Sequence, residues 1–260
     1  MNELLAVAER LARHAGKVAL EGRRSGSLDA GTKSTPTDIV TRYDRECERI
    51  IVDGLRESRP GDGLVGEEGT SLQGTTDVEW HIDPIDGTSN YFFDLPTWAC
   101  SIGARDCHGP VAGAVYLPVL DEMFTASRGG GAFLNGRPIS PRDVTEVSQA
   151  LLATGFGYDP EARAAHGRIV ASMVGKVRDI RRLGAASIDM CFVACGRLDA
   201  YCEGGLNSWD VTAAQLILTE AGCTVSDLNG GPASNTEVIA APPAIHAGIV
   251  DLYRNAKAAR

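Results

Sequence analysis

The segment WHIDPIDGTSNYF (residues 80–92) places two aspartates three residues apart, with a proline between them and Gly-Thr directly after. The apolar and aromatic residues before Asp83 predict the end of a β-strand. Pro84 has no backbone N–H, so we expect the hydrogen-bonded ladder of that strand to stop there. The turn that follows brings Asp83 and Asp86 close together, with the carbonyl of Ile85 between them. Carboxylate and carbonyl oxygens suit Mg²⁺ or Mn²⁺ rather than zinc.

The residues after Asp86 add a second element to this site. Gly87 allows close approach of the backbone. A helix that begins at Gly87-Thr88 would point its free N–H groups at an anion beside the metal. Metal ligands next to an anion site indicate a phosphate ester as the ligand. Asp-Pro and Asp-Gly are also frequent turn formers, so the segment taken alone equally fits an ordinary turn.

Composition limits the classes of protein to consider. The 260 residues, 43% hydrophobic and 23% charged, are enough for one large domain or two joined halves. The net charge of −9, from 25 basic and 34 acidic residues, argues against wide nucleic-acid contact, which needs clustered Lys and Arg. No run of about 18 apolar residues predicts a membrane span, and the charges throughout residues 1–22 argue against a signal peptide. The seven cysteines, with no Cys-x-x-Cys, indicate free thiols in a reducing cytoplasm.

Apolar periodicity and turn residues predict a mixed order of elements. Helices are expected over residues 3–24 and 38–56, with the loop SGSLDAGTKSTPTD between them. Residues 98–133 have the strand-and-turn pattern of an antiparallel meander. In the second half, strands alternate with helices; the strands are 150–155, 177–184, 198–203, 224–228 and 237–241, and the helices 160–175, 185–196, 209–222 and 243–257. We expect two regions, 1–140 and 141–260, that share one core.

Acidic residues elsewhere in the chain could complete the site. LVGEEGT places Glu67 and Glu68 after a short apolar run, TDIVTRYD places Asp44 on a predicted helix, and EGGLNSWD places Asp210 at the start of another. Each has a simpler interpretation, because Glu-Glu pairs are usually solvated and an acid at a helix N-terminus usually caps it.

Taken together, these motifs resemble the inositol monophosphatase family, whose members are Mg²⁺-dependent, lithium-sensitive phosphatases. The resemblance rests on GEE, DPIDGT and WD-x-x-A at this spacing, and it covers almost the whole chain: KSTPTDIVTRYD, GGGAFLNGRPI and the segment from LGAASID to LTEAG also match. It implies an α+β fold, a layered αβαβα sandwich of the inositol monophosphatase and fructose-1,6-bisphosphatase type.

The resemblance also implies a set of metal ligands. Glu67, Asp83 and the carbonyl of Ile85 would hold a first Mg²⁺, and Asp83, Asp86 and Asp210 a second, with Asp83 shared between them. A third, weaker Mg²⁺ would lie near Glu67, so that two or three ions are expected per site. Mn²⁺ is an alternative ion.

Catalytic and substrate-binding roles follow from the same resemblance. The Thr88 hydroxyl, paired with Asp44, would orient the attacking water, and Lys33 on the N-terminal loop would approach the metal-bound waters and help close the site. The Gly87 and Thr88 amides would bind the phosphate. The full set of implied substrate-binding residues is Asp86, Gly87, Thr88, Ala186 (through its backbone), Glu203 and Asp210.

The substrate is the least determined feature. The small, polar segment Gly204–Ser208 suits a small polyol phosphate such as inositol 1-phosphate. Histidinol phosphate is an alternative, because an acidic pocket could hold an ammonium group. Fructose 1,6-bisphosphate or 3′-phosphoadenosine 5′-phosphate would need a second cationic pocket, for which the adjacent Arg181 and Arg182 are candidates, although a strand-end salt bridge is the simpler interpretation. Ala185 stands where many members of the family carry Thr or Ser, and Asn207 where the animal enzymes carry His. Both positions are expected near the sugar part of the substrate.

Two expectations concern partners. We expect a homodimer that acts on a small-molecule phosphate ester, without a nucleic-acid or membrane partner. A non-enzymatic role as a regulatory binding protein is the alternative from a different class, since some bacterial relatives are reported to bind the transcription machinery. A pocket with four clustered carboxylates argues against a purely structural role, because it is costly without a metal to balance it.

Overall fold

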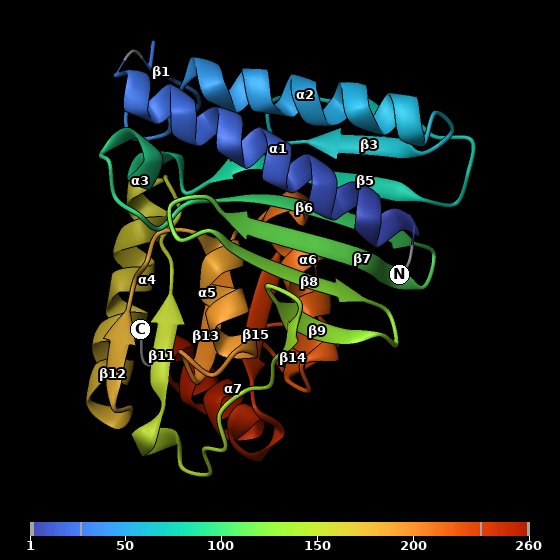
Figure 1. The fold of residues 1–260 in the computed structure, drawn as a ribbon. Helices are drawn as coiled ribbons and strands as arrows, with labels where there is room; N and C mark the ends of the chain where they lie inside the picture. Colours follow the sequence, from blue (N-terminus) through green and yellow to red (C-terminus); the bar gives the residue numbers. More distant parts are fainter. Residues whose placement is uncertain (1–2, 27, 235, 259–260) are drawn as a thin grey trace.

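Two long N-terminal helices form the outermost layer of the molecule. The computed structural model describes residues 3–26, 28–234 and 236–258. Helix α1 (Glu3–Ser25) buries a stripe of alanines and leucines, and α2 (Arg42–Ser58) buries its own apolar stripe beside it. Figure 1 shows both helices lying along one face of the larger β-sheet, and their buried residues share one hydrophobic cluster with that sheet.

The larger sheet has eight strands in the order β10-β9-β8-β7-β6-β5-β3-β4. Its strands are β3 (Gly63–Gly66), β4 (Ser71–Leu72), β5 (Glu79–Asp86), β6 (Ala99–Asp106), β7 (Gly109–Leu117), β8 (Glu122–Ser127), β9 (Gly131–Leu134) and β10 (Arg137–Pro138). The run from β5 to β10 is antiparallel throughout, which confirms the predicted meander, whereas β3 and β5 are parallel. A short helix α3 (Thr88–Phe92) follows β5, and a small hairpin of β1 (Gly31–Thr32) and β2 (Ile39–Val40) precedes α2.

The second half builds a five-stranded sheet in the order β12-β11-β13-β15-β14. Its strands are β11 (Leu151–Thr154), β12 (Asp179–Arg181), β13 (Ala200–Gly204), β14 (Thr224–Ser226) and β15 (Glu237–Ala241). Its helices are α4 (Pro160–Met173), α5 (Ala186–Ala194), α6 (Ser208–Glu220) and α7 (Pro243–Ala258). Short 3₁₀ turns occur at Val147–Gln149 and Val174–Lys176.

Helices α5 and α6 lie between the two sheets, and α4 and α7 cover the outer face of the smaller one (Figure 1). The order of layers is therefore αβαβα, which confirms the predicted fold class. Gly103 on β6 and Gly113 on β7 are directly paired. A Cβ on either would lie 2.7 Å from backbone atoms of Ala213. These glycines let α6 approach the sheet closely, and its N-terminus, which carries Asp210, is thereby brought to the end of β5.

Three predicted boundaries are wrong for identifiable reasons. Helix α2 begins at Arg42 and not at Asp38, because Ile39–Val40 pair with Gly31–Thr32. Strand β5 continues through Pro84 to Asp86, since a register shift between Asp83 and Asp86 places the proline in a bulge. The strand expected over 177–184 is limited to Asp179–Arg181, because only these three residues pair with β11.

Two further expectations concern the chain as a whole. No helix among the described residues is long and apolar enough to cross a bilayer. All seven cysteines are free thiols, as the sequence predicts. Buried Cys behaves as a small apolar side chain, and five of the seven are buried in this way.

Candidate active site

The ends of β5 and β13 and the first turns of α3, α5 and α6 meet around one pocket with a volume of about 170 Å³. Six carboxylates line it, and they belong to Glu67, Asp83, Asp86, Asp189, Glu203 and Asp210. Arg182 is the one cation among the lining residues that the structure describes. The pocket is thus strongly acidic, and it contains every carboxylate that the sequence assigns to the metal.

The bulge in β5 turns two carboxylates into this pocket. Asp83 is buried, and its Oδ1 accepts the N–H of Ile85 at 3.1 Å. Asp86 Oδ2 accepts the N–H and the hydroxyl of Ser187 at 2.7 and 2.5 Å, and Oδ1 accepts the N–H of Ala186 at 3.2 Å. The N-terminus of α5 therefore stabilises the charge of Asp86.

Gly87 makes the turn from β5 into α3 possible. It has a left-handed backbone with φ of +88°, and a Cβ there would lie 3.1 Å from both the Thr97 carbonyl oxygen and the Ala185 Cβ. Only glycine fits this conformation and this space without strain. Gly87 is the N-cap of α3, so the first N–H groups of that helix begin at the pocket wall, where the sequence predicts a phosphate.

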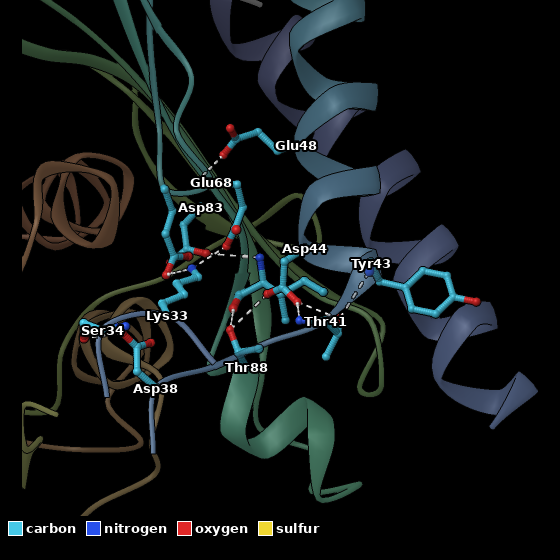
Figure 2. A network of polar contacts seen from close by, with 12 residues as sticks. Lys33, Ser34, Asp38, Thr41, Tyr43, Asp44, Glu48, Glu68, Asp83 and Thr88 are labelled. Atoms are coloured by element: carbon cyan, nitrogen blue, oxygen red, sulfur yellow. Dashed lines mark hydrogen bonds and ion pairs between the residues drawn. The ribbon is translucent and has the colours of Figure 1, made fainter. Parts of the chain in front are cut away.

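Thr88 and Asp44 are in direct contact, as Figure 2 shows. The Thr88 hydroxyl lies 3.1 Å from Asp44 Oδ1 and 3.0 Å from the carbonyl of Ile85, and its single proton serves one acceptor at a time. Asp44 Oδ2 accepts the N–H and hydroxyl of Thr41 at 2.7 and 2.6 Å in a capping box at the start of α2. Burial raises the pKa of Asp44 to about 6. The residue thus both caps its helix and contacts Thr88.

The loop after β3 brings Glu67 and Glu68 to the same region. Strand β3 runs parallel to β5 and ends at Gly66 opposite Ile82, one residue before Asp83, and the Glu67 N–H donates to the carbonyl of Ile82 at 3.1 Å. Lys33 Nζ contacts Glu67 Oε1 at 3.0 Å and also pairs with Glu68 (Figure 2). Burial lowers the pKa of Lys33, but the two carboxylates outweigh it, so the pKa is raised above its ordinary value.

Asp210 lies in the first turn of α6 and serves as a helix cap as well. Its Oδ2 accepts the N–H of Asn207 at 2.6 Å, so the simpler interpretation of this acid is also correct. Ser208 Oγ, two residues earlier, lies 2.7 Å from Nδ1 of the buried His81 on β5. This contact ties the helix N-terminus to the strand that carries Asp83.

Glu203 lines the pocket from strand β13. Its Oε2 accepts the hydroxyl of Tyr201 at 2.6 Å, and burial raises its pKa to about 7. A Cβ at Gly155 would lie 1.9 Å from the same oxygen, so this glycine leaves the space that the carboxylate fills.

The donor set fits a divalent cation by its chemistry. Burial raises the pKa of Asp86 to about 6, and burial together with the neighbouring carboxylates raises those of Asp83 and Asp210 well above their ordinary range. A hard cation with oxygen ligands would relieve this repulsion. No group of three His, Cys, Asp or Glu side chains within the described residues already has a metal-holding arrangement. Several of these carboxylate oxygens instead accept hydrogen bonds from protein donors, among them Lys33 Nζ and the backbone N–H groups of Ser187 and Asn207.

Several residues in or beside the pocket were not predicted from the sequence. Ser187 lies outside the pocket lining and donates to Asp86, and the buried Asp189 in the lining has an Oδ1 without a hydrogen-bond partner among the described residues. The loop Gly155–Tyr158 lines the opening. The salt-bridge interpretation is correct for Arg181, which pairs with Asp179 at 2.6 Å, whereas Arg182 lines the pocket. Ser187 lies in the first turn of the helix predicted over 185–196, and that position could have identified it as a neighbour of the pocket. A loop such as Gly155–Tyr158 gives no comparable signal.

The layered fold and its acid-lined pocket define a phosphatase. The profile of the inositol monophosphatase family matches residues 1–258, and the chain belongs to that family. Inositol-1-monophosphatase SuhB of Mycobacterium tuberculosis is 42% identical, covering 92% of this chain and 89% of that protein. Nus factor SuhB of Escherichia coli K12 is 37% identical, covering 89% and 87%. The crystal structure of the extragenic suppressor protein suhB of Bartonella henselae superimposes with a TM-score of 0.91 at 31% identity, covering 97% of this chain and 99% of that one.

Proposed function

We propose that the chain is a Mg²⁺-dependent phosphomonoesterase that hydrolyses a small polyol phosphate, with inositol 1-phosphate as the favoured substrate. The observation that carries the proposal is the convergence of Glu67, Asp83, Asp86 and Asp210 on one pocket beside the N-terminus of α3. The name of the mycobacterial relative supports the choice of substrate. Homodimer formation stays a prediction.

The residues divide into metal-holding and phosphate-holding sets. Glu67, Asp83, Asp86, Asp210 and the carbonyl of Ile85 would hold two or three Mg²⁺ ions. When bound, these ions neutralise phosphate charge and lower the pKa of water. The backbone N–H groups at Gly87 and Thr88 hold the phosphate at the start of α3.

Three other residues act on the water and on access to the site. The Thr88 hydroxyl, which Asp44 accepts at 3.1 Å, orients the attacking water in line with the ester bond. Asp44 keeps that hydroxyl in place, because its other oxygen is fixed by Thr41. Lys33, on the N-terminal loop, would help close the site, and a metal held by Glu67 would compete with the contact that Lys33 makes to that carboxylate.

The part of the pocket around Glu203 selects the leaving group. Glu203 accepts hydrogen bonds from substrate hydroxyls there, and Ala186 also lines the pocket at the start of α5. The Ala186 N–H already donates to Asp86, so its role is to shape the pocket rather than to donate to the substrate. Asp189 and Glu203 make this part of the pocket acidic, which keeps an ammonium-bearing ester such as histidinol phosphate as the second candidate.

Substitutions at Glu203 and Asp210 are expected to have different effects. Glu203→Gln should raise KM for inositol 1-phosphate and reorder a panel of phosphate esters, at a cost of about 1–3 kcal/mol for a polar group left unpaired. Asp210→Asn should lower kcat for every ester alike, because it weakens a metal that all of them share. Steady-state kinetics of both variants on inositol 1-phosphate, histidinol phosphate and fructose 1,6-bisphosphate measure this. A reordering by Asp210→Asn with a uniform loss in Glu203→Gln would reverse the two assignments.

A further inference from the structure

Helix α2 carries a second buried carboxylate one turn after Asp44. Glu48 is 4% exposed, and the spacing of four residues places it on the same helix face as Asp44. Asp44 reaches Thr88, whereas Glu48 reaches the turn that follows β3 (Figure 2). One face of α2 therefore holds two separate segments that border the candidate active site, Thr88 and the turn after β3.

The Glu48 carboxylate fills the inside of the turn Gly66–Thr70. Oε2 accepts the N–H of Glu68 at 2.8 Å, and Oε1 accepts the N–H and the hydroxyl of Thr70 at 3.1 and 2.6 Å. The Gly66 N–H closes the turn by donating to the Thr70 carbonyl at 2.8 Å. Three donors on one buried carboxylate fix the backbone on both sides of the turn.

The first residue of the GEE motif is explained by the same contact. A Cβ at Gly66 would lie 2.5 Å from Glu48 Oε2 and 2.6 Å from Glu48 Cδ, so any side chain there would displace the carboxylate. The turn and the acid fit together only when residue 66 is glycine. Glu67 extends from this turn toward the pocket, where burial raises its pKa beside Asp83.

We infer that Glu48 is a positioning residue that sets Glu67 opposite Asp83 by holding the turn Gly66–Thr70. It does not touch the pocket, since it is absent from the lining residues and faces the backbone of the turn. Its effect reaches the metal through Glu67, so the inference rests on the proposed metal-dependent function. A partner that orients a ligand in this way is usually worth roughly 10- to 100-fold in metal affinity.

Binding of Mn²⁺ without substrate, followed by electron paramagnetic resonance of the free ion, tests this inference. Glu48→Gln places an amide N–H₂ against a backbone N–H, so its Kd for Mn²⁺ should rise roughly 10- to 100-fold. Thr70→Val, which removes only the hydroxyl contact, should raise Kd by a smaller factor. Thr70→Ser keeps the hydroxyl and should have a Kd near the wild-type value. Glu46→Gln is the matched control, because Glu46 is exposed on the same helix.

The outcomes separate this inference from the proposed function. Wild-type Mn²⁺ affinity in folded Glu48→Gln and Thr70→Val proteins would overturn the role of Glu48 and leave the metal site intact. A wild-type protein that binds no Mn²⁺ would overturn both. If Glu48→Gln does not fold by circular dichroism, Thr70→Val against the wild type decides the question, since Val keeps the shape of Thr and removes only the hydroxyl that donates to Glu48.

Discussion

Asp83→Asn is expected to abolish phosphate release while making the metal-free protein at least as stable as the wild type. Asp83 is the ligand that both proposed metal positions share, so its loss should reduce kcat by orders of magnitude. Its pKa is raised by burial and by Glu67, Asp86 and Asp210, so removing its charge relieves repulsion in the folded state. An asparagine oxygen can still accept the Ile85 N–H.

Turnover with Mg²⁺ and thermal melting without it measure the two halves of this expectation. Asp77→Asn is a suitable control, because Asp77 is exposed just before the same strand. Near-normal turnover in a folded Asp83→Asn protein would remove Asp83 from the metal site.

Thr88→Ala and Asp44→Asn should each reduce kcat strongly, and the double variant should be little worse than either one. The reason is that the Thr88 hydroxyl and the Asp44 carboxylate form one hydrogen-bonded unit, so losing either member removes the function of both. Thr88→Ser keeps the hydroxyl and should retain most of the activity. Strictly additive losses in a double-mutant cycle would mean that the two residues act independently.

Asp44 also caps α2 through Thr41, and the stability of each variant must therefore be measured alongside its rate. An asparagine at position 44 can still accept from Thr41, and the cost of a changed N-cap contact is about 1 kcal/mol. A loss of kcat in a protein that melts near the wild-type temperature then reports the contact with Thr88 and not the helix cap.

Periodicity and turn residues predict most helices and strands of this fold, and the antiparallel meander follows from them. The order of the layers is instead what the family resemblance implies, because periodicity within an element does not say which elements pack together. The predicted start of α2 is too early because Ile39 fits the apolar stripe of that helix, whereas Ile39 and Val40 pair with strand β1. Pro84 was expected to end β5, since a proline cannot donate to a ladder, but a bulge removes the need for that donor.

The sequence likewise predicts some residues of the candidate site and not others. The four carboxylates predicted to hold metal do meet in one pocket, because the motifs that carry them are specific. Glu48, Ser187 and Asp189 were not predicted, since each is a common residue type on a helix and its contact depends on a distant segment. The simpler interpretation of Asp210 as a helix cap is also correct, because its first-turn position serves both the cap and the pocket.

Phosphate release from inositol 1-phosphate by the wild-type chain, measured with Mg²⁺, after chelation and after Mg²⁺ is restored, tests the central claim most directly. A phosphatase whose acidic pocket works through bound Mg²⁺ should release phosphate in the first state, lose that activity on chelation and regain it on restoration. Millimolar lithium added to the restored enzyme should inhibit it, as the family resemblance implies. Release that is indifferent to chelation, or no release from any ester of the panel by the folded, Mg²⁺-supplied protein, would contradict the account.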